Sequence, residues 1–232
     1  MSESILRNLP RHIDISCVQA HHARPDIEEL AAAARRGGFV SAHVLPNWVP
    51  VLRELLQGSD TLAGGPAGFP SGGSTTGTKL AEIGGLLESG AQEVDVVVNI
   101  GRLRSMELDY VTAELAAAVD LVDGAVPLRA ILEVGHLTDE QLLAGCDCAL
   151  EAGVPWIKTG TGWSGRPTTL RHIELIAARV AGRAQLKAAG GIRELATVEA
   201  MVDLGVTRFG VNAAVAMELA TQARAAHQAP AR

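Results

Sequence analysis

Residues 128–161 of the chain read LRAILEVGHLTDEQLLAGCDCALEAGVPWIKTGT, and this stretch decides the fold class. Two short, mostly apolar runs at 128–134 and 156–161 have the length and composition of strands, and 139–151 between them has the pattern of a helix. Thr138 directly precedes two acidic residues and is expected to cap that helix. A strand, a helix and a second strand in this order predict a parallel βαβ unit.

The same alternation continues along the whole sequence. Further strands are expected at 12–18, 40–45, 61–69, 93–100, 185–189 and 207–211, and further helices at 26–36, 51–57, 79–88, 108–122, 170–180, 194–204 and 214–227. Eight strand–helix pairs predict an α/β protein whose residues 1–232 form a single closed (β/α)8 barrel, the TIM barrel. A doubly wound open sheet is the alternative, but it normally has fewer units and often a Gly-rich dinucleotide turn, which this sequence lacks.

The composition of the chain limits the classes of protein to which it can belong. The chain has 232 residues, 47% of them hydrophobic and 20% charged, and its net charge of −6 argues against a nucleic-acid partner. No apolar run is long enough to span a bilayer, and the N-terminus lacks the pattern of a signal peptide. Cys17, Cys146 and Cys148 lack the CxxC spacing of a zinc site and are too few for a disulfide framework. A cytoplasmic protein that acts on a small molecule is expected.

Three charged residues lie inside otherwise apolar strands. Asp95 lies in EVDVVVNIG, Lys158 in WIKTGTG and Lys187 in QLKAAGG. One buried ion pair between Asp95 and one lysine is the simpler explanation, but one carboxylate and two lysines on three strands do not form a single pair. Burial and mutual repulsion should lower the pKa of one lysine, and a neutral amine is what Schiff-base formation with a carbonyl needs.

The turns after the last two strands suggest an anion site. Gly190 and Gly191 follow one strand, with Arg193 close by, and Gly210 and Asn212 lie at the end of the next. Glycines allow backbone N–H groups to approach an anion, helix N-termini favour phosphate, and barrels often bind phosphate at these two loops. Ordinary turn geometry is the alternative explanation for the glycines.

Other candidates are less specific. His43 lies within the second strand, where it can either face the cavity or be a hydrogen-bonded core residue. Lys79 begins a helix and is expected to be a surface charge. The third strand is weak because Gly64, Gly65 and Pro66 are poor residues for a central strand. No HxH or HExxH spacing is present, so no metal site is expected.

At these residues the sequence resembles the deoxyribose-phosphate aldolase family. The matching stretches are IDIS at 13–16, GFPSGGSTTGTK at 68–79, GAQEVDVVVNIGRLRS at 90–105, AILEVGHLTDE at 130–140, AGVPWIKTGTGW at 152–163, LKAAGGIR at 186–193 and RFGVNAA at 208–214. They run in the family's order and cover nearly the whole chain.

The resemblance implies a role for each candidate. Lys158 is similar to the Schiff-base lysine, Lys187 to the second lysine that assists proton transfer, and Asp95 to the acid/base carboxylate. The substrate-binding residues that it implies are Gly190, Gly191, Gly210, Asn212, Ser16 and Thr159. The family joins acetaldehyde to glyceraldehyde 3-phosphate, giving 2-deoxyribose 5-phosphate, or runs the reverse. It uses no metal or organic cofactor and commonly forms homodimers.

Several positions depart from the family's pattern. Asn212 and Ala213 stand where two serines usually help to hold phosphate, and Gly160 interrupts the usual TSTG. His43 stands where the family often has cysteine. Two alternatives therefore remain: an aldolase of this family with a different or unphosphorylated acceptor aldehyde, and a non-catalytic barrel that binds a phosphorylated metabolite.

Overall fold

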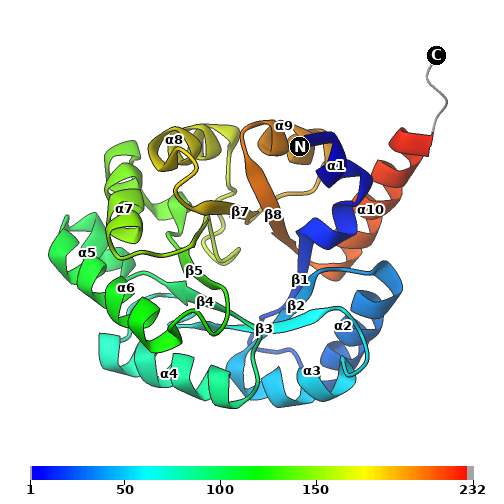
Figure 1. Ribbon diagram of the computed structural model, residues 1–232, viewed down its shortest axis with the longest axis horizontal. Coiled ribbons are helices and arrows are strands. Elements are labelled where there is room, and N and C mark those ends of the chain that lie inside the picture. The colour runs from blue at the N-terminus through cyan, green and yellow to red at the C-terminus, as the bar shows by residue number, and fades with distance from the viewer. Residues whose placement is uncertain (1, 229–232) are drawn as a thin grey trace.

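A closed barrel of eight parallel strands forms the centre of the molecule, as the computed structural model of residues 2–228 shows (Figure 1). The strands are β1 (Ile13–Cys17), β2 (Ser41–Val44), β3 (Leu62–Ala67), β4 (Glu93–Val97), β5 (Leu128–Ile131), β6 (Trp156–Lys158), β7 (Gln185–Ala189) and β8 (Val206–Val211). Each pairs in parallel with the next, and β8 pairs with β1. The predicted (β/α)8 fold is confirmed.

Helices surround the barrel and cover its outer face (Figure 1). They are α1 (Ser2–Arg7), α2 (Arg24–Gly37), α3 (Val49–Leu55), α4 (Thr76–Glu88), α5 (Ile100–Arg104), α6 (Leu108–Val122), α7 (Asp139–Glu151), α8 (Leu170–Val180), α9 (Leu195–Asp203) and α10 (Ala213–Gln228). The short helices α1 and α5 were not expected from the sequence. The predicted cap of α7 is confirmed, because the Thr138 hydroxyl accepts a hydrogen bond from the Gln141 N–H at 3.3 Å.

The strands separate an apolar layer outside the barrel from a polar interior. In β4, Val94 and Val96 are buried in the hydrophobic core that the helices share, whereas Glu93 and Asp95 carry buried ion pairs. Successive side chains of a strand point to opposite faces, so a charge at every second position follows from the strand period. Barrel interiors are usually filled by branched apolar residues, and this departure marks the interior as functional.

The weak third strand has a packing explanation. A Cβ added to Gly64 would lie 2.5 Å from the His43 ring, and one added to Gly65 would lie 2.6 Å from Leu86. Gly64 pairs with His43 across the β2–β3 ladder. The two glycines therefore make room for side chains on the two faces of the sheet.

Lys79 is not a surface charge, so that expectation is wrong. Its side chain is 1% exposed, and its ammonium donates hydrogen bonds to Glu114 at 2.7 Å and to the Val97 carbonyl at 2.8 Å. Helix α4 begins at Thr76, three residues earlier than expected, which places Lys79 inside the helix and against the barrel.

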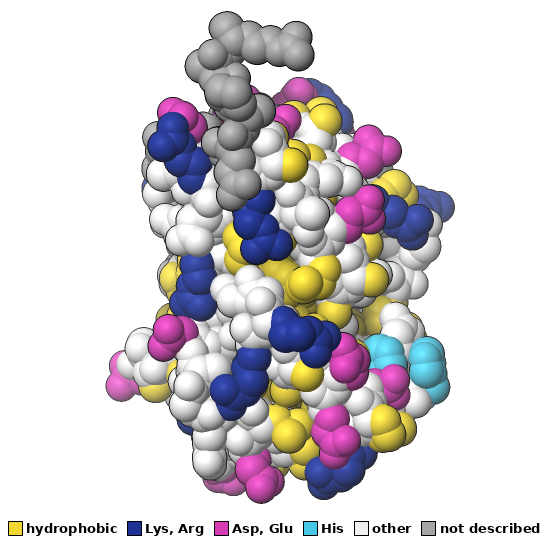
Figure 2. All heavy atoms as spheres, turned by 90° about the vertical axis from the view of Figure 1, so that its right-hand side faces the viewer, with side chains coloured by type: hydrophobic (Ala, Val, Ile, Leu, Met, Phe, Trp, Pro, Cys, Tyr) yellow, Lys and Arg dark blue, Asp and Glu magenta, His cyan; other side chains and the backbone are white. Residues whose placement is uncertain are grey.

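Charges of both signs are interspersed on the face that carries α10 and α2, in keeping with the modest net charge of −6 (Figure 2). Within residues 2–228, no helix combines the length and the apolar character that crossing a membrane would require.

Candidate active site

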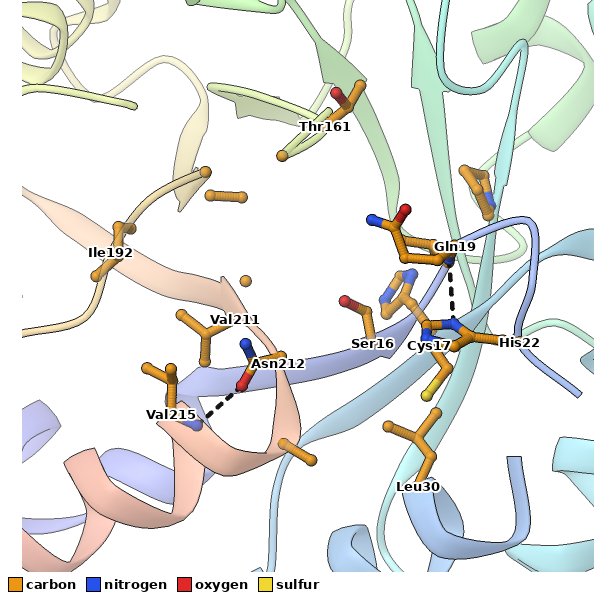
Figure 3. Close-up of a pocket in the computed structure, with 18 of the residues that line it drawn as sticks. Ser16, Cys17, Gln19, His22, Leu30, Thr161, Ile192, Val211, Asn212 and Val215 are labelled. Atoms are coloured by element: carbon orange, nitrogen blue, oxygen red, sulfur yellow. Dashed lines mark hydrogen bonds between the residues drawn. The ribbon is translucent and has the colours of Figure 1, made fainter. Parts of the chain in front are cut away.

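A cavity of about 600 Å³ lies at the carboxyl ends of the strands, where active sites of such barrels are found. Ser16 and Gln19 enter it from the end of β1, Ile192 from the loop after β7, and Val211 and Asn212 from the end of β8 (Figure 3). Segments at opposite ends of the sequence therefore share one cavity because the barrel closes between β8 and β1.

The structure brings the three predicted charged residues together. The Lys158 ammonium lies 2.7 Å from Asp95 Oδ2, and the Lys187 ammonium lies 3.3 Å from the same oxygen. The two amines differ in access: the Lys158 side chain is 12% exposed and lines the cavity, whereas that of Lys187 is 1% exposed. Lys158 is therefore the amine that a ligand can reach.

Further charges below this trio escaped the sequence analysis. Lys187 contacts Asp14 at 2.6 Å, which is closer than its contact with Asp95. Arg129 spans two carboxylates, with Glu93 at 2.5 Å and Asp95 at 3.1 Å, and Arg208 contacts Glu93 at 2.9 Å. The strand period of two could have indicated these charged residues. Each of them either lies two positions from another inward-facing residue of its own strand or pairs with an inward-facing residue of the next strand.

Burial and the surrounding charges shift the pKa values of Asp95 and Lys187. Burial works to raise the pKa of Asp95, but the charges of Lys158 and Lys187 outweigh it and hold that pKa well below its usual value. Burial lowers the pKa of Lys187 to about 8, against the attraction of Asp14 and Asp95. A lowered lysine pKa was predicted, and it falls on the less accessible amine.

The interior charges balance when one amine is neutral. The groups are three carboxylates (Asp14, Glu93, Asp95), two guanidiniums (Arg129, Arg208) and two amines (Lys158, Lys187). Two charged amines would give four positive charges against three negative ones, and one neutral amine removes the excess. Because uncompensated buried charge is costly, this excess favours the loss of one proton from the pair of amines.

One cluster has the composition of a metal site. Asp14, His43 and Glu93 each bring a potential ligand atom within 4.8 Å of the others. Lys187 and Arg208 already neutralise the two carboxylates. A divalent cation there would face these charges at close range, so the arrangement fits an ion-pair network better than a metal site.

One part of the cavity lining, the anion wall, consists of Gly190, Gly191, Arg193 and Asn212 and has the features of an anion site. Gly190 and Gly191 have φ of 99° and 79°, values that favour glycine, and both line the cavity with Arg193. Asn212 lies at the start of α10, and its side-chain carbonyl accepts a hydrogen bond from the Val215 N–H at 2.9 Å (Figure 3). The Asn212 amide N–H groups therefore remain as donors beside the N-terminus of a long helix.

The other substrate-binding candidates separate into two groups. Ser16 and Gly210 line the cavity. Thr159 does not reach it: the side chain is 2% exposed, donates to the Ala189 carbonyl at 2.9 Å and receives a hydrogen bond from Thr168. Thr159 therefore fixes the end of β6 against the end of β7.

Gln19 and His22 are cavity residues that the sequence analysis did not single out. The Gln19 N–H donates to the His22 ring at 3.1 Å, which fixes the turn after β1 (Figure 3). Nothing in the sequence distinguishes this turn from a solvated loop, since its position depends on how far β1 extends beyond the barrel.

Several known proteins of similar sequence are deoxyribose-phosphate aldolases. A deoxyribose-phosphate aldolase from Sinorhizobium medicae is 50% identical over 220 residues, which cover 94% of this chain and 88% of that protein. One from Klebsiella pneumoniae is 44% identical, covering 87% of this chain and 82% of that one. No family model matches the chain.

Solved structures agree with the sequence comparison. A tetrameric deoxyribose phosphate aldolase from Aeropyrum pernix superposes with a TM-score of 0.85 at 25% identity, covering 94% of this chain and 91% of that one. Relatives at up to 50% identity along almost their whole length, together with a barrel of the same form, place the chain in one family. The protein belongs to the deoxyribose-phosphate aldolase family, a family of lyases.

Proposed function

We propose that the protein is a class I aldolase that cleaves 2-deoxy-D-ribose 5-phosphate to acetaldehyde and D-glyceraldehyde 3-phosphate, and catalyses the reverse reaction, through a Schiff base on Lys158. One observation carries the proposal. Lys158 lines the cavity and its amine contacts Asp95 at 2.7 Å, while the buried Lys187 contacts the same carboxylate oxygen. The relatives named for this activity support the same substrate.

The mechanism starts from the neutral Lys158 amine. It attacks the aldehyde carbon of the open-chain sugar and gives a carbinolamine. The nitrogen lone pair then forms the C=N bond while the hydroxyl leaves as water, with a proton that Asp95 relays from Lys187. The two groups are placed for this relay because Lys187 lies 3.3 Å from Asp95.

The carbon–carbon bond breaks from the iminium state. Asp95 and Lys187 take the proton from the hydroxyl on the third carbon, which releases glyceraldehyde 3-phosphate, and the electron pair of the bond between the second and third carbons moves into an enamine. A proton added to the second carbon restores the iminium ion, and water releases acetaldehyde and the free amine.

The anion wall would hold the phosphate of the sugar. Gly190, Gly191, Asn212 and Arg193 line the cavity, and the donors that they would offer to a phosphate are backbone N–H groups, an amide and a guanidinium. Ala213 contributes no hydroxyl, and this absence favours the second candidate function, an aldolase of the same chemistry whose acceptor is unphosphorylated.

A direct assay separates these functions. Purified protein with a chelator present should cleave 2-deoxyribose 5-phosphate, and kcat/KM for plain 2-deoxyribose should be at least about 100-fold lower, since binding energy from the remote phosphate lowers the barrier. Equal or better turnover of the plain sugar would establish the second candidate. Binding of the phosphorylated sugar with neither turnover nor a trapped imine would identify a non-catalytic barrel.

The pH profile should report the second lysine. Because the pKa of Lys187 is lowered to about 8, its ammonium is present below that pH and lost above it. We expect kcat/KM for cleavage to fall as the pH rises through about 8, since the proton needed to expel water is then missing. Initial rates measured across this range, with circular dichroism to verify folding, test this. A profile that stays flat well above pH 8 would exclude Lys187 as the proton source.

A further inference from the structure

His43 lines the cavity, and the mechanism proposed above assigns it no role. It lies on β2, pairs with Ser16 of β1 and Gly64 of β3, and lines the cavity with a side chain that is 6% exposed. Ser16 points into the same cavity (Figure 3). The absence of a side chain at Gly64 is what admits the imidazole, because a Cβ there would overlap the ring.

The surroundings of the ring fix its tautomer. Nε2 lies 3.2 Å from Glu93 Oε2. Burial and Asp14 work to raise the pKa of Glu93, but His43, Arg129 and Arg208 outweigh them and lower it to about 2, so this carboxylate is charged and can only accept. Nε2 therefore carries the hydrogen.

The second ring nitrogen is then left as an acceptor. Burial, followed by the nearby charge of Lys187, lowers the pKa of His43, against the attraction of Asp95, Glu93 and Asp14. The three carboxylates face the ring from β1 and β4 and Lys187 lies on β7, while Arg208 and Lys158 contact the carboxylate oxygens of Glu93 and Asp95 that the ring faces. The imidazole is neutral at neutral pH, and its Nδ1 has a free lone pair.

The Nδ1 atom of His43 lies near the carboxylate oxygen that contacts the Lys158 amine. It lies 3.8 Å from Asp95 Oδ2, the oxygen that contacts the Lys158 amine at 2.7 Å. Both atoms are acceptors, and 3.8 Å is too long for a hydrogen bond between them. Asp95 Oδ2 already accepts from Lys158 and Lys187, whereas Nδ1 is an acceptor close to the nucleophile that suits a ligand hydroxyl donating to it.

We propose that His43 Nδ1 accepts a hydrogen bond from the carbinolamine hydroxyl on Lys158 and so orients it for departure. This inference rests on the proposed function. The hydroxyl hydrogen points to Nδ1, and an oxygen lone pair then faces the acid formed by Asp95 and Lys187. As the C–O bond breaks, the oxygen takes its proton from that acid and leaves as water, while His43 neither gains nor loses a proton.

Two variants of matched polarity separate this role from a structural one. In His43→Gln, the amide N–H can take the place of Nε2 beside Glu93, but no acceptor remains at the position of Nδ1. In His43→Asn, the amide oxygen takes the place of Nδ1, and the contact with Glu93 is lost. We expect kcat to fall about 100-fold in the Gln variant with little change in KM, and less than about 10-fold in the Asn variant.

The opposite order, an equal loss in both variants or an effect confined to KM would overturn the proposal. Thermal unfolding of each variant establishes that it is folded before rates are compared. Should either variant fail to fold, nitrogen NMR of the intact enzyme provides the test: the Nε2–H tautomer is expected, and the Nδ1–H tautomer would overturn the proposal. If wild-type protein forms no reducible adduct, the proposed function fails; if it does and the order is reversed, only the role of His43 fails.

Discussion

Replacement of Lys158 by alanine should lower kcat for cleavage of 2-deoxyribose 5-phosphate by at least about 10,000-fold, because the covalent route then has no nucleophile. Lys187 cannot substitute for it, since its side chain is 1% exposed and is held by Asp14 at 2.6 Å. The loss should fall on kcat, and binding of the phosphorylated sugar should persist because the anion wall is unchanged.

Trapping with borohydride makes this prediction specific. The chain has three lysines, Lys79, Lys158 and Lys187, and Lys158 is the one that lines the cavity. With acetaldehyde and borohydride, peptide mapping should find a reduced ethyl group on Lys158 in the wild type and none at the corresponding peptide in Lys158→Ala. Lys79→Arg, which retains a cation beside Glu114, serves as the control and should still be labelled. A lysine adduct that persists in Lys158→Ala would place the nucleophile elsewhere.

Substitution of Asp95 by asparagine should have the next largest effect. This carboxylate contacts Lys158, Lys187 and Arg129, so it is the proton relay and also the shared counter-charge of three cations. We expect kcat to fall about 1,000-fold through loss of the relay, and the free energy of unfolding to fall by about 3 kcal/mol through loss of the buried charge. Steady-state rates and guanidinium unfolding measure the two effects.

A neighbouring carboxylate of the same strand separates catalysis from stability. Glu93 is equally buried and pairs with Arg129 and Arg208. In Glu93→Gln the stability loss should be similar, while the imine on Lys158 still forms and turnover falls far less, because the amide oxygen can still accept from His43. Equal losses of kcat in the two variants would show that Asp95 acts only through the charge of the network.

Asp14 illustrates why part of the site could not be found in the sequence. IDIS shows one acidic residue in an apolar strand, but that residue contacts Lys187, 173 positions later in the chain, at 2.6 Å. A strand pattern gives the face on which a side chain lies, and it does not give the distance to a side chain on another strand. Register and the stagger of neighbouring strands decide that distance, and both depend on the closed barrel.

The sequence alone determined the barrel and the interior position of three of its charged residues. Strand and helix periods are local properties, and a period of two places Asp95, Lys158 and Lys187 on the inner face wherever their strands lie. The tertiary structure decided which amine is accessible, that Thr159 is engaged between two strands, that Lys79 is buried, and that His43 faces Asp95. Access and contact depend on packing between segments far apart in the chain, because burial is set by whatever covers a side chain and not by its own neighbours in sequence.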